Sequence, residues 1–151
     1  MDETVQMDQI DRKIVNALSS NARLSMAELA AKVGLSKSPT QTRVKRLERD
    51  GVILGYSARV NYEKMGRGHI AFVQVTVNDT RAAALNAFNE AVKQTPEIAQ
   101  CHMMAASFDY LLKVRTKDIL AYRRVLGEVI SALPHVAQTS TFVAMESVKE
   151  Y

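Results

Sequence analysis

Residues 25–50, SMAELAAKVGLSKSPTQTRVKRLERD, constrain the fold of this chain more than any other stretch. Their first half, up to Gly34, repeats apolar residues at helical spacing: Met26, Leu29, Ala30 and Val33. Their second half places Val44 and Leu47 on one apolar stripe and is followed by Gly51. Two short helices joined by a glycine turn are the outline of a helix-turn-helix.

Each of these two helices carries signals for its own start. Ser25 and Glu28 have the spacing of a capping box before the first helix. For the second, Ser38 offers a hydroxyl N-cap, Pro39 suits the first helical position, and Gln41 completes a box with Ser38. The sequence therefore predicts a helix that begins at Pro39 and has a polar, basic outward face.

Two flanking segments extend this unit. Residues 7–20 predict a further helix, with apolar residues four apart at Ile10, Ile14 and Leu18. Residues 52–60 form a short apolar stretch that bends at Gly55, which predicts either a two-stranded wing or an extended connector. Together these segments predict a winged helix-turn-helix domain over residues 1–60.

The polar face of the second helix suits double-stranded DNA. A Gln amide matches adenine, an Arg fork matches guanine, a Thr methyl can touch thymine, and Ser and Lys suit phosphates. The predicted DNA contacts are Ser36, Lys37, Ser38, Thr40, Gln41, Arg43, Lys45 and Arg46. The alternative is a basic helix face that is merely solvated, and the agreement of the flanking helices with a DNA-binding head argues against it.

The distribution of positive charge along the chain also favours DNA binding by the N-terminal segment. The 151 residues have a formal net charge of +4. Residues 1–60 hold ten Lys and Arg against seven Asp and Glu, a net +3, and residues 61–151 hold ten against nine, a net +1. Residues 36–46 contain no acid, as binding to a phosphate backbone favours.

A second unit follows a polar, glycine-containing hinge at residues 61–68. Alternating and helical periodicities then predict strands and helices in the order βαββαβ, a ferredoxin-like sandwich of the α+β class over residues 69–151. The predicted strands are 69–77, 98–105, 108–115 and 136–148, and the predicted helices are 80–94 and 117–133. Both helices are expected on one face of the sheet.

The other sheet face is expected to be bare. We expect it to carry Phe72, Met103, Tyr110 or their neighbours, and such a face on a globular protein is commonly covered by a second copy. A homodimer is therefore expected, and two heads on a two-fold axis would read a palindromic site.

Other function classes lack sequence support. His69, His102 and His135 are scattered, and the sequence has no metal-ligand spacing, phosphate loop or nucleophile motif, so we expect no enzyme, metal or cofactor. No apolar run approaches the length of a membrane span and no leader is recognisable, so we expect a cytoplasmic protein with no membrane partner. The single Cys101 is expected to be a small buried hydrophobe, with a redox-sensing role as the alternative.

Taken in order, several segments give the chain a resemblance over essentially its full length to the Lrp/AsnC, or feast/famine, regulators. The matching segments are MDQIDRKIVNAL, RLSMAELAAKVGLS, RVKRLERDGVI followed by GY, FDYLLKVR, AYRRVLGE, and LPHV followed by TSTFV and ME. The resemblance implies an N-terminal winged helix-turn-helix and a C-terminal module that forms dimers and then octamers or larger rings. It also implies a small effector, usually an amino acid, bound at contacts between dimers.

Carried onto this chain, the resemblance assigns effector binding to the turn before the third predicted strand and to the last strand. The residues implied are Met103, Met104, Ala106, Ser107, Asp109, Thr141, Phe142 and Val143. Asp109 could accept hydrogen bonds from an ammonium group, or it could be a turn acid that bonds the backbone. Many relatives have Gly-Asp where this chain has Ala106-Ser107, so an altered specificity is expected.

Three functions therefore stay open on the sequence. The first is an effector-responsive, sequence-specific transcriptional regulator, and the second is an architectural protein that wraps DNA without an effector. The third is a ligand-binding or enzymatic ferredoxin-like domain whose head serves assembly. The first is the leading interpretation, and replacing Arg43 and Arg46 in the basic face of the predicted helix would discriminate among the three.

Overall fold

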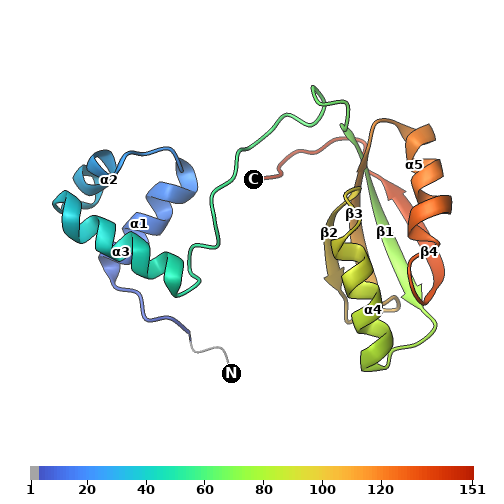
Figure 1. Cartoon of the computed structure of the whole chain (residues 1–151). Helices are drawn as coiled ribbons and strands as arrows, with labels where there is room; N and C mark the ends of the chain where they lie inside the picture. Colours follow the sequence, from blue (N-terminus) through green and yellow to red (C-terminus); the bar gives the residue numbers. More distant parts are fainter. Residues whose placement is uncertain (1–3) are drawn as a thin grey trace. The chain divides into compact units, whose positions relative to one another are not determined.

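The computed structural model describes residues 4–151, so the first three residues of the predicted head lie outside it. Its contacts divide the chain into two compact units, one ending at Arg59 and the other beginning at Val60 (Figure 1). Each unit has its own apolar core and is described by itself.

The N-terminal unit consists of α1 (Gln9–Ser20), α2 (Met26–Val33) and α3 (Lys37–Arg49). Ser25 and Glu28 cap α2 reciprocally, as the sequence predicts, and Gly34 ends that helix in the left-handed conformation. The buried core joins all three helices through Ile14, Leu18, Leu29, Val33, Val44 and Leu47. Because these residues repeat at helical spacing, they bury one face of each helix and leave the other in solvent.

The predicted start of α3 is wrong by two residues. The helix begins at Lys37, with Ser36 as its N-cap, and Pro39 is its third residue. The first four N–H groups of a helix have no intrahelical acceptor, so a proline is tolerated anywhere in this turn. The N–H groups of Gly34 and Leu35 close α2, which leaves Ser36 as the extended residue between the helices.

Residues 52–60 form an extended connector and not the two-stranded wing that was the other prediction for them. All nine are described, and none lies in a strand. The N–H groups of Val52 and Ile53 bond the carbonyl of Leu47 and close the end of α3. Gly51 makes this possible because it adopts a φ of 72°, a conformation that glycine reaches without strain.

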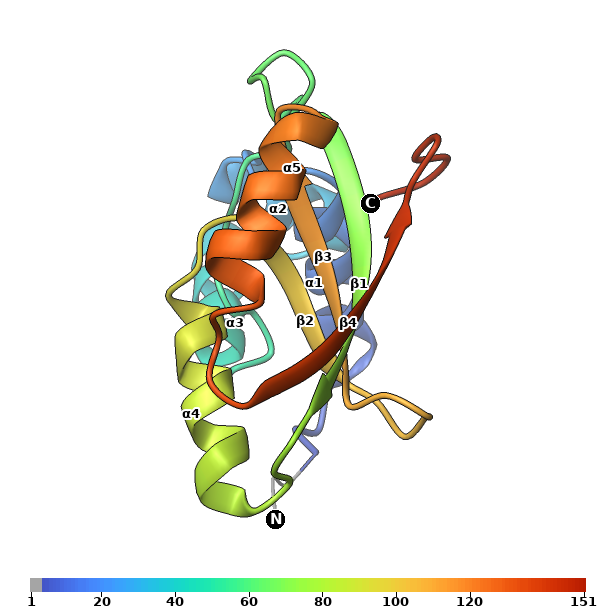
Figure 2. The same ribbon diagram turned by 90° about the vertical axis from the view of Figure 1, so that its right-hand side faces the viewer.

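The C-terminal unit has the predicted βαββαβ order: β1 (His69–Val77), α4 (Ala82–Lys93), β2 (Ile98–Met103), β3 (Tyr110–Thr116), α5 (Ile119–Val125) and β4 (Val136–Val143). A π-helical turn (Leu126–Ile130) continues α5. The strands form one antiparallel sheet in the order β2-β3-β1-β4. Both helices cover the same face of it (Figure 2). The strand β4 ends at Val143, five residues earlier than predicted.

The register decides which side chains face the helices. Tyr110 pairs with Val75, whose side chain is in the core, and directly paired residues lie on the same face. Tyr110 is accordingly buried against Phe88 of α4, so its predicted place on the bare face is wrong. Met103 pairs directly with Tyr110 and lies on the same face, so its predicted place is wrong too. Phe72 pairs with Phe142 on that open face instead. Cys101 packs against the core, and burial raises the pKa of its thiol.

The segment predicted as a hinge, residues 61–68, folds as a turn of the C-terminal unit. The Arg67 guanidinium donates to the carbonyl of Pro96, and the Tyr62 ring lies 4.0 Å from the guanidinium carbon of Arg115. Among residues 4–151, no helix is both long and apolar enough to cross a membrane.

Candidate functional site: the face of α3 and the turn before β3

The predicted DNA contacts fall into three groups on α3. Five lie in solvent on its N-terminal half and outer face: Ser36, Lys37, Ser38, Gln41 and Lys45. Thr40 is fully buried, and its hydroxyl donates to the carbonyl of Ser36, so its predicted contact with a thymine methyl is wrong. It points inward because it lies one turn before Val44 on the apolar stripe.

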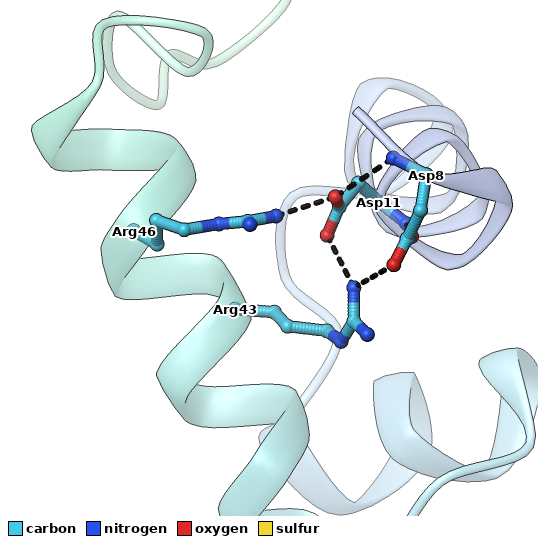
Figure 3. A network of polar contacts seen from close by, with 4 residues as sticks. All are labelled: Asp8, Asp11, Arg43 and Arg46. Carbon is cyan, nitrogen blue, oxygen red and sulfur yellow. Dashed lines mark hydrogen bonds and ion pairs between the residues drawn. The ribbon is translucent and has the colours of Figure 1, made fainter. Parts of the chain in front are cut away.

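The third group, Arg43 and Arg46, turns toward α1 (Figure 3). Nη1 of Arg43 lies 2.8 Å from Oδ1 of Asp11 and 2.6 Å from Oδ2 of Asp8. Nη2 of Arg46 forms an ion pair with Oδ2 of Asp11. These two arginines therefore tie α3 to the start of α1, an arrangement that their sequence positions did not predict.

The carboxylate at the centre of this network is almost completely buried. Asp11 has 1% of its surface exposed, and it also accepts a hydrogen bond from the N–H of Asp8 in a reciprocal capping box. Burial raises the pKa of the Asp11 carboxyl, but the hydrogen bonds from Arg43, Asp8 and Arg46 outweigh it and leave the pKa below the ordinary value. The same contacts raise the pKa of Arg43. The charged forms of Asp11 and Arg43 are thus favoured.

Asp8 and Asp11 were not predicted as site residues, although the sequence carries a signal for both. Asp11 falls on the apolar stripe of α1, three residues before Ile14 and seven before Leu18. An acid at such a position must be paired when it is buried. Asp8 also precedes it by three residues, as in a capping box.

In the C-terminal unit, backbone and side-chain hydrogen bonds hold the turn before β3 in place. Asp109 donates its N–H to Val75 and accepts the N–H of Met104, and its carboxylate accepts the N–H of Val77 at 2.8 Å. The Asp109 side chain thus takes the backbone-bonding alternative. The tip of the turn, residues 104–107, is exposed.

Within one chain, the effector residues implied by resemblance are not all brought together. Thr141 to Val143 pair with Val73 to Ala71 on β1, whereas the turn is bonded to Val75 and Val77. A strand extends about 13 Å from Val73, the partner of Thr141, to Val77, which bonds the Asp109 carboxylate, so these two parts of the implied site lie apart. Thr141 also faces α5, where its hydroxyl shares a hydrogen bond with Tyr122.

A polar hollow of about 140 Å³ lies beside the turn instead. It joins Ser107 and Phe108 of the turn to strand residues that the sequence did not single out: Gln74, Thr76, Gln138, Thr139 and Ser140. Amide and hydroxyl groups predominate, so it can donate and accept hydrogen bonds but carries no formal charge of its own. Nowhere in residues 4–151 do three or more His, Cys, Asp or Glu gather as metal ligands would.

Comparisons with known proteins agree with both halves of this geometry. A family model for the winged helix-turn-helix DNA-binding domain matches residues 7–53, and the Lrp/AsnC ligand binding domain matches residues 70–151. The proline dehydrogenase transcriptional activator of Rhizobium radiobacter is 56% identical over 98% of this chain and 95% of its own length.

The chain belongs to the Lrp/AsnC family.

One further relative and two solved structures extend the similarity. The leucine-responsive regulatory protein of Escherichia coli K12 is 44% identical, over 95% of this chain and 88% of its own. An AsnC family transcriptional regulator from Agrobacterium tumefaciens has a TM-score of 0.89 at 34% identity, covering 95% of this chain and 94% of its own. A transcriptional regulator from Neisseria meningitidis, solved as a complex with L-Met, has a TM-score of 0.88 at 28% identity, covering 96% and 94%.

This Lrp/AsnC protein is therefore a DNA-binding transcriptional regulator with a ligand-binding domain. Its relatives are transcriptional regulators, which confirms the prediction of a regulator rather than an enzyme. The architecture that they share also confirms the predicted combination of a winged helix-turn-helix head and a ferredoxin-like sandwich.

Proposed function

We propose that this regulator binds a palindromic DNA site through the exposed face of α3 and changes its DNA occupancy when an amino acid binds its C-terminal unit. The observation that carries the DNA part is the solvent exposure of Lys37, Gln41 and Lys45 on one helix. Gln41 would read a base edge and the two lysines would neutralise phosphates, with Ser36 and Ser38 as hydrogen-bond donors.

Two heads would be supplied by a homodimer formed through the open sheet face. Phe72 and Phe142 pair on that face, and Phe142 is 54% exposed. Exposed aromatic groups on a sheet favour burial against a second copy. Larger assemblies, octamers among them, would bring the turn of one dimer against another.

The effector would be a small amino acid held by the turn before β3. The exposed residues 104–107 and the polar hollow at Ser107 offer hydrogen bonds beside a fixed Asp109. The Rhizobium radiobacter relative is named as a transcriptional activator of proline dehydrogenase, so proline is the first effector to test. A regulator of a proline-degrading enzyme would usefully sense the substrate of that enzyme.

Fluorescence anisotropy would test both parts. The purified full chain is titrated onto a labelled duplex from upstream of the proline dehydrogenase gene of its own organism and onto a scrambled duplex, with and without L-proline. D-proline and L-leucine serve as ligand controls. We expect tighter binding to the upstream duplex and a shift with L-proline alone.

The outcomes separate the alternatives. Preference for the upstream duplex that no amino acid alters would contradict the effector part of the proposal. Equal affinity for both duplexes would contradict sequence-specific recognition and favour an architectural DNA-wrapping protein. Light scattering of the same samples would report the assembly, and a monomer would contradict the homodimer.

A further inference from the structure

Two arginines on the DNA-binding helix converge on one buried carboxylate. Arg43 and Arg46 lie three residues apart on α3, and both bond Asp11, which is 32 and 35 residues away in the chain (Figure 3). We propose that Arg43 and Arg46 serve DNA recognition as positioning residues, which orient α3 through Asp11 and contact neither phosphates nor bases. This inference rests on the proposed contact between α3 and DNA.

The charge balance of the network supports this role. Arg43 and Arg46 contribute +2, and Asp8 and Asp11 contribute −2, so the four groups together carry no net charge. Counterion release at DNA depends on positive charge that is free to neutralise phosphates. Among the described residues, no ion pair involves Lys37 or Lys45, whereas the other three cations of α3 are paired, so on this helix those two lysines are left to supply it.

The network lies between α1 and α3, which explains why the orientation of α3 relative to α1 would depend on it. The contact between α1 and α3 is otherwise apolar, through Ile14, Val44 and Leu47. Apolar burial is favourable but non-directional, so it does not by itself fix the rotation of one helix against the other. Hydrogen bonds from two arginines to both oxygens of Asp11 are directional and define one orientation.

Asp11→Asn is the decisive variant, because the two possible roles of this acid predict opposite signs. Asp11 is buried and negatively charged, so it cannot itself bind DNA. If the negative charge of Asp11 acted only by weakening the electrostatic attraction between the protein and DNA, removing that charge would strengthen DNA binding. If Asp11 positions α3, the variant weakens binding, and we expect a loss of at least tenfold. Asp50→Asn is the charge-matched control, since Asp50 pairs with Arg49 at the other end of α3.

Affinities are measured with the full-length protein and a 30-base-pair duplex over a series of salt concentrations, at temperatures where circular dichroism shows each variant folded. Weaker binding by Asp11→Asn with an unchanged salt slope, and no weakening by Asp50→Asn, supports the proposal. Unchanged or tighter binding by Asp11→Asn overturns it.

Substitutions at Arg43 supply a second, independent readout. Lysine can still neutralise a phosphate but cannot bridge two carboxylates as a guanidinium does. We expect Arg43→Lys to weaken binding as much as Arg43→Gln, both with an unchanged salt slope. A slope lowered by about one in Arg43→Gln, with binding rescued in Arg43→Lys, identifies a phosphate contact and overturns the proposal.

The proposed DNA interface is judged separately, on Lys37→Gln and Lys45→Gln. Each should lower the salt slope by about one without changing the urea midpoint of unfolding. If neither alters affinity or slope, the interface on α3 is wrong, whatever Asp11→Asn shows.

Discussion

The hydroxyl of Tyr56 donates a hydrogen bond to the carboxylate of Glu48, with 2.7 Å between the two oxygen atoms. The bond fastens the connector after Gly51 to the last turns of α3. Partial burial, the hydrogen bond to Glu48 and the negative charge of Glu48 together raise the pKa of Tyr56 to about 12, although the residue is 51% exposed.

A pH dependence follows from this raised pKa. The folded unit favours the protonated phenol, so the stability that Tyr56 contributes is fully present below pH 10 and is lost as the pH rises toward 12. We expect Tyr56→Phe to remove one late-titrating phenol from the ultraviolet titration at 295 nm. Burial also raises the pKa of Tyr110 and Tyr122, so the comparison with the wild type decides. If Tyr56→Phe leaves the number of late-titrating phenols unchanged, the bond to Glu48 is absent in solution.

Acid should weaken the N-terminal unit through Asp8 and Asp11. Hydrogen bonds from the Asp11 N–H and from Arg43 lower the pKa of Asp8, and the pKa of Asp11 is lowered too. Because both folded pKa values lie below the ordinary 3.8, the stability is present above that pH and is lost as the pH falls below it. Urea unfolding followed by circular dichroism from pH 6 to pH 2 should show this loss, and Asp11→Asn should flatten it.

Gln41 and Lys37 should differ in what they contribute to DNA binding. We expect Gln41→Ala to weaken the binding free energy for the preferred site by about 1–3 kcal/mol, because a base-edge contact is lost. The same substitution should relax the base preference at one position. Lys37→Ala should weaken binding to all sequences alike. Selection from a random duplex library with each variant checks this, and equal effects of both on every sequence would contradict the assignment.

The C-terminal segment should detach when Glu150 is neutralised. Its Oε1 atom lies 2.5 Å from Nζ of Lys113 and 2.6 Å from Nη2 of Arg115. The hydrogen bond from Lys113 lowers the pKa of Glu150, and Arg115 acts in the same sense. We expect Glu150→Gln to destabilise the attachment of this segment by about 1–3 kcal/mol of free energy, because two largely buried cations lose a charged partner.

Limited proteolysis near residue 148 would detect this release as faster cleavage. Glu146→Gln is the matched control, because Glu146 is an exposed acid of the same segment. Equal cleavage rates for Glu150→Gln and the wild type would refute the prediction.

Comparing alanine substitutions at Gly51 and Gly127 separates the effect of backbone conformation from that of steric crowding. A Cβ at either position would meet nothing within 4 Å, but only Gly51 has a positive φ, of 72°. We expect Gly51→Ala to lower the free energy of unfolding by about 1–2 kcal/mol, the cost of a left-handed L-residue. Gly127→Ala should be neutral or slightly stabilising, as for alanine in a helix. Thermal unfolding of the two variants compares them directly.

Much of the secondary structure was predictable because its causes are local. The Ser25 and Glu28 box, the apolar spacing of Ile14 and Leu18, and the alternation of β1 each act over a few residues. The resemblance in the order of the segments added the family, and the comparisons bear it out. The start of α3 was misplaced because a proline is acceptable throughout the first turn, so Pro39 by itself does not fix the boundary.

What the sequence by itself determined is the identity of the elements, their order and the polar face of α3, since these depend on short-range periodicity and capping. The tertiary structure decided that Asp11 binds Arg43 and Arg46, that Tyr110 faces α4, and that the turn lies beside Gln138 rather than Thr141. Those contacts join residues far apart in the chain. They depend on strand register and helix docking, which arise only when the two cores pack.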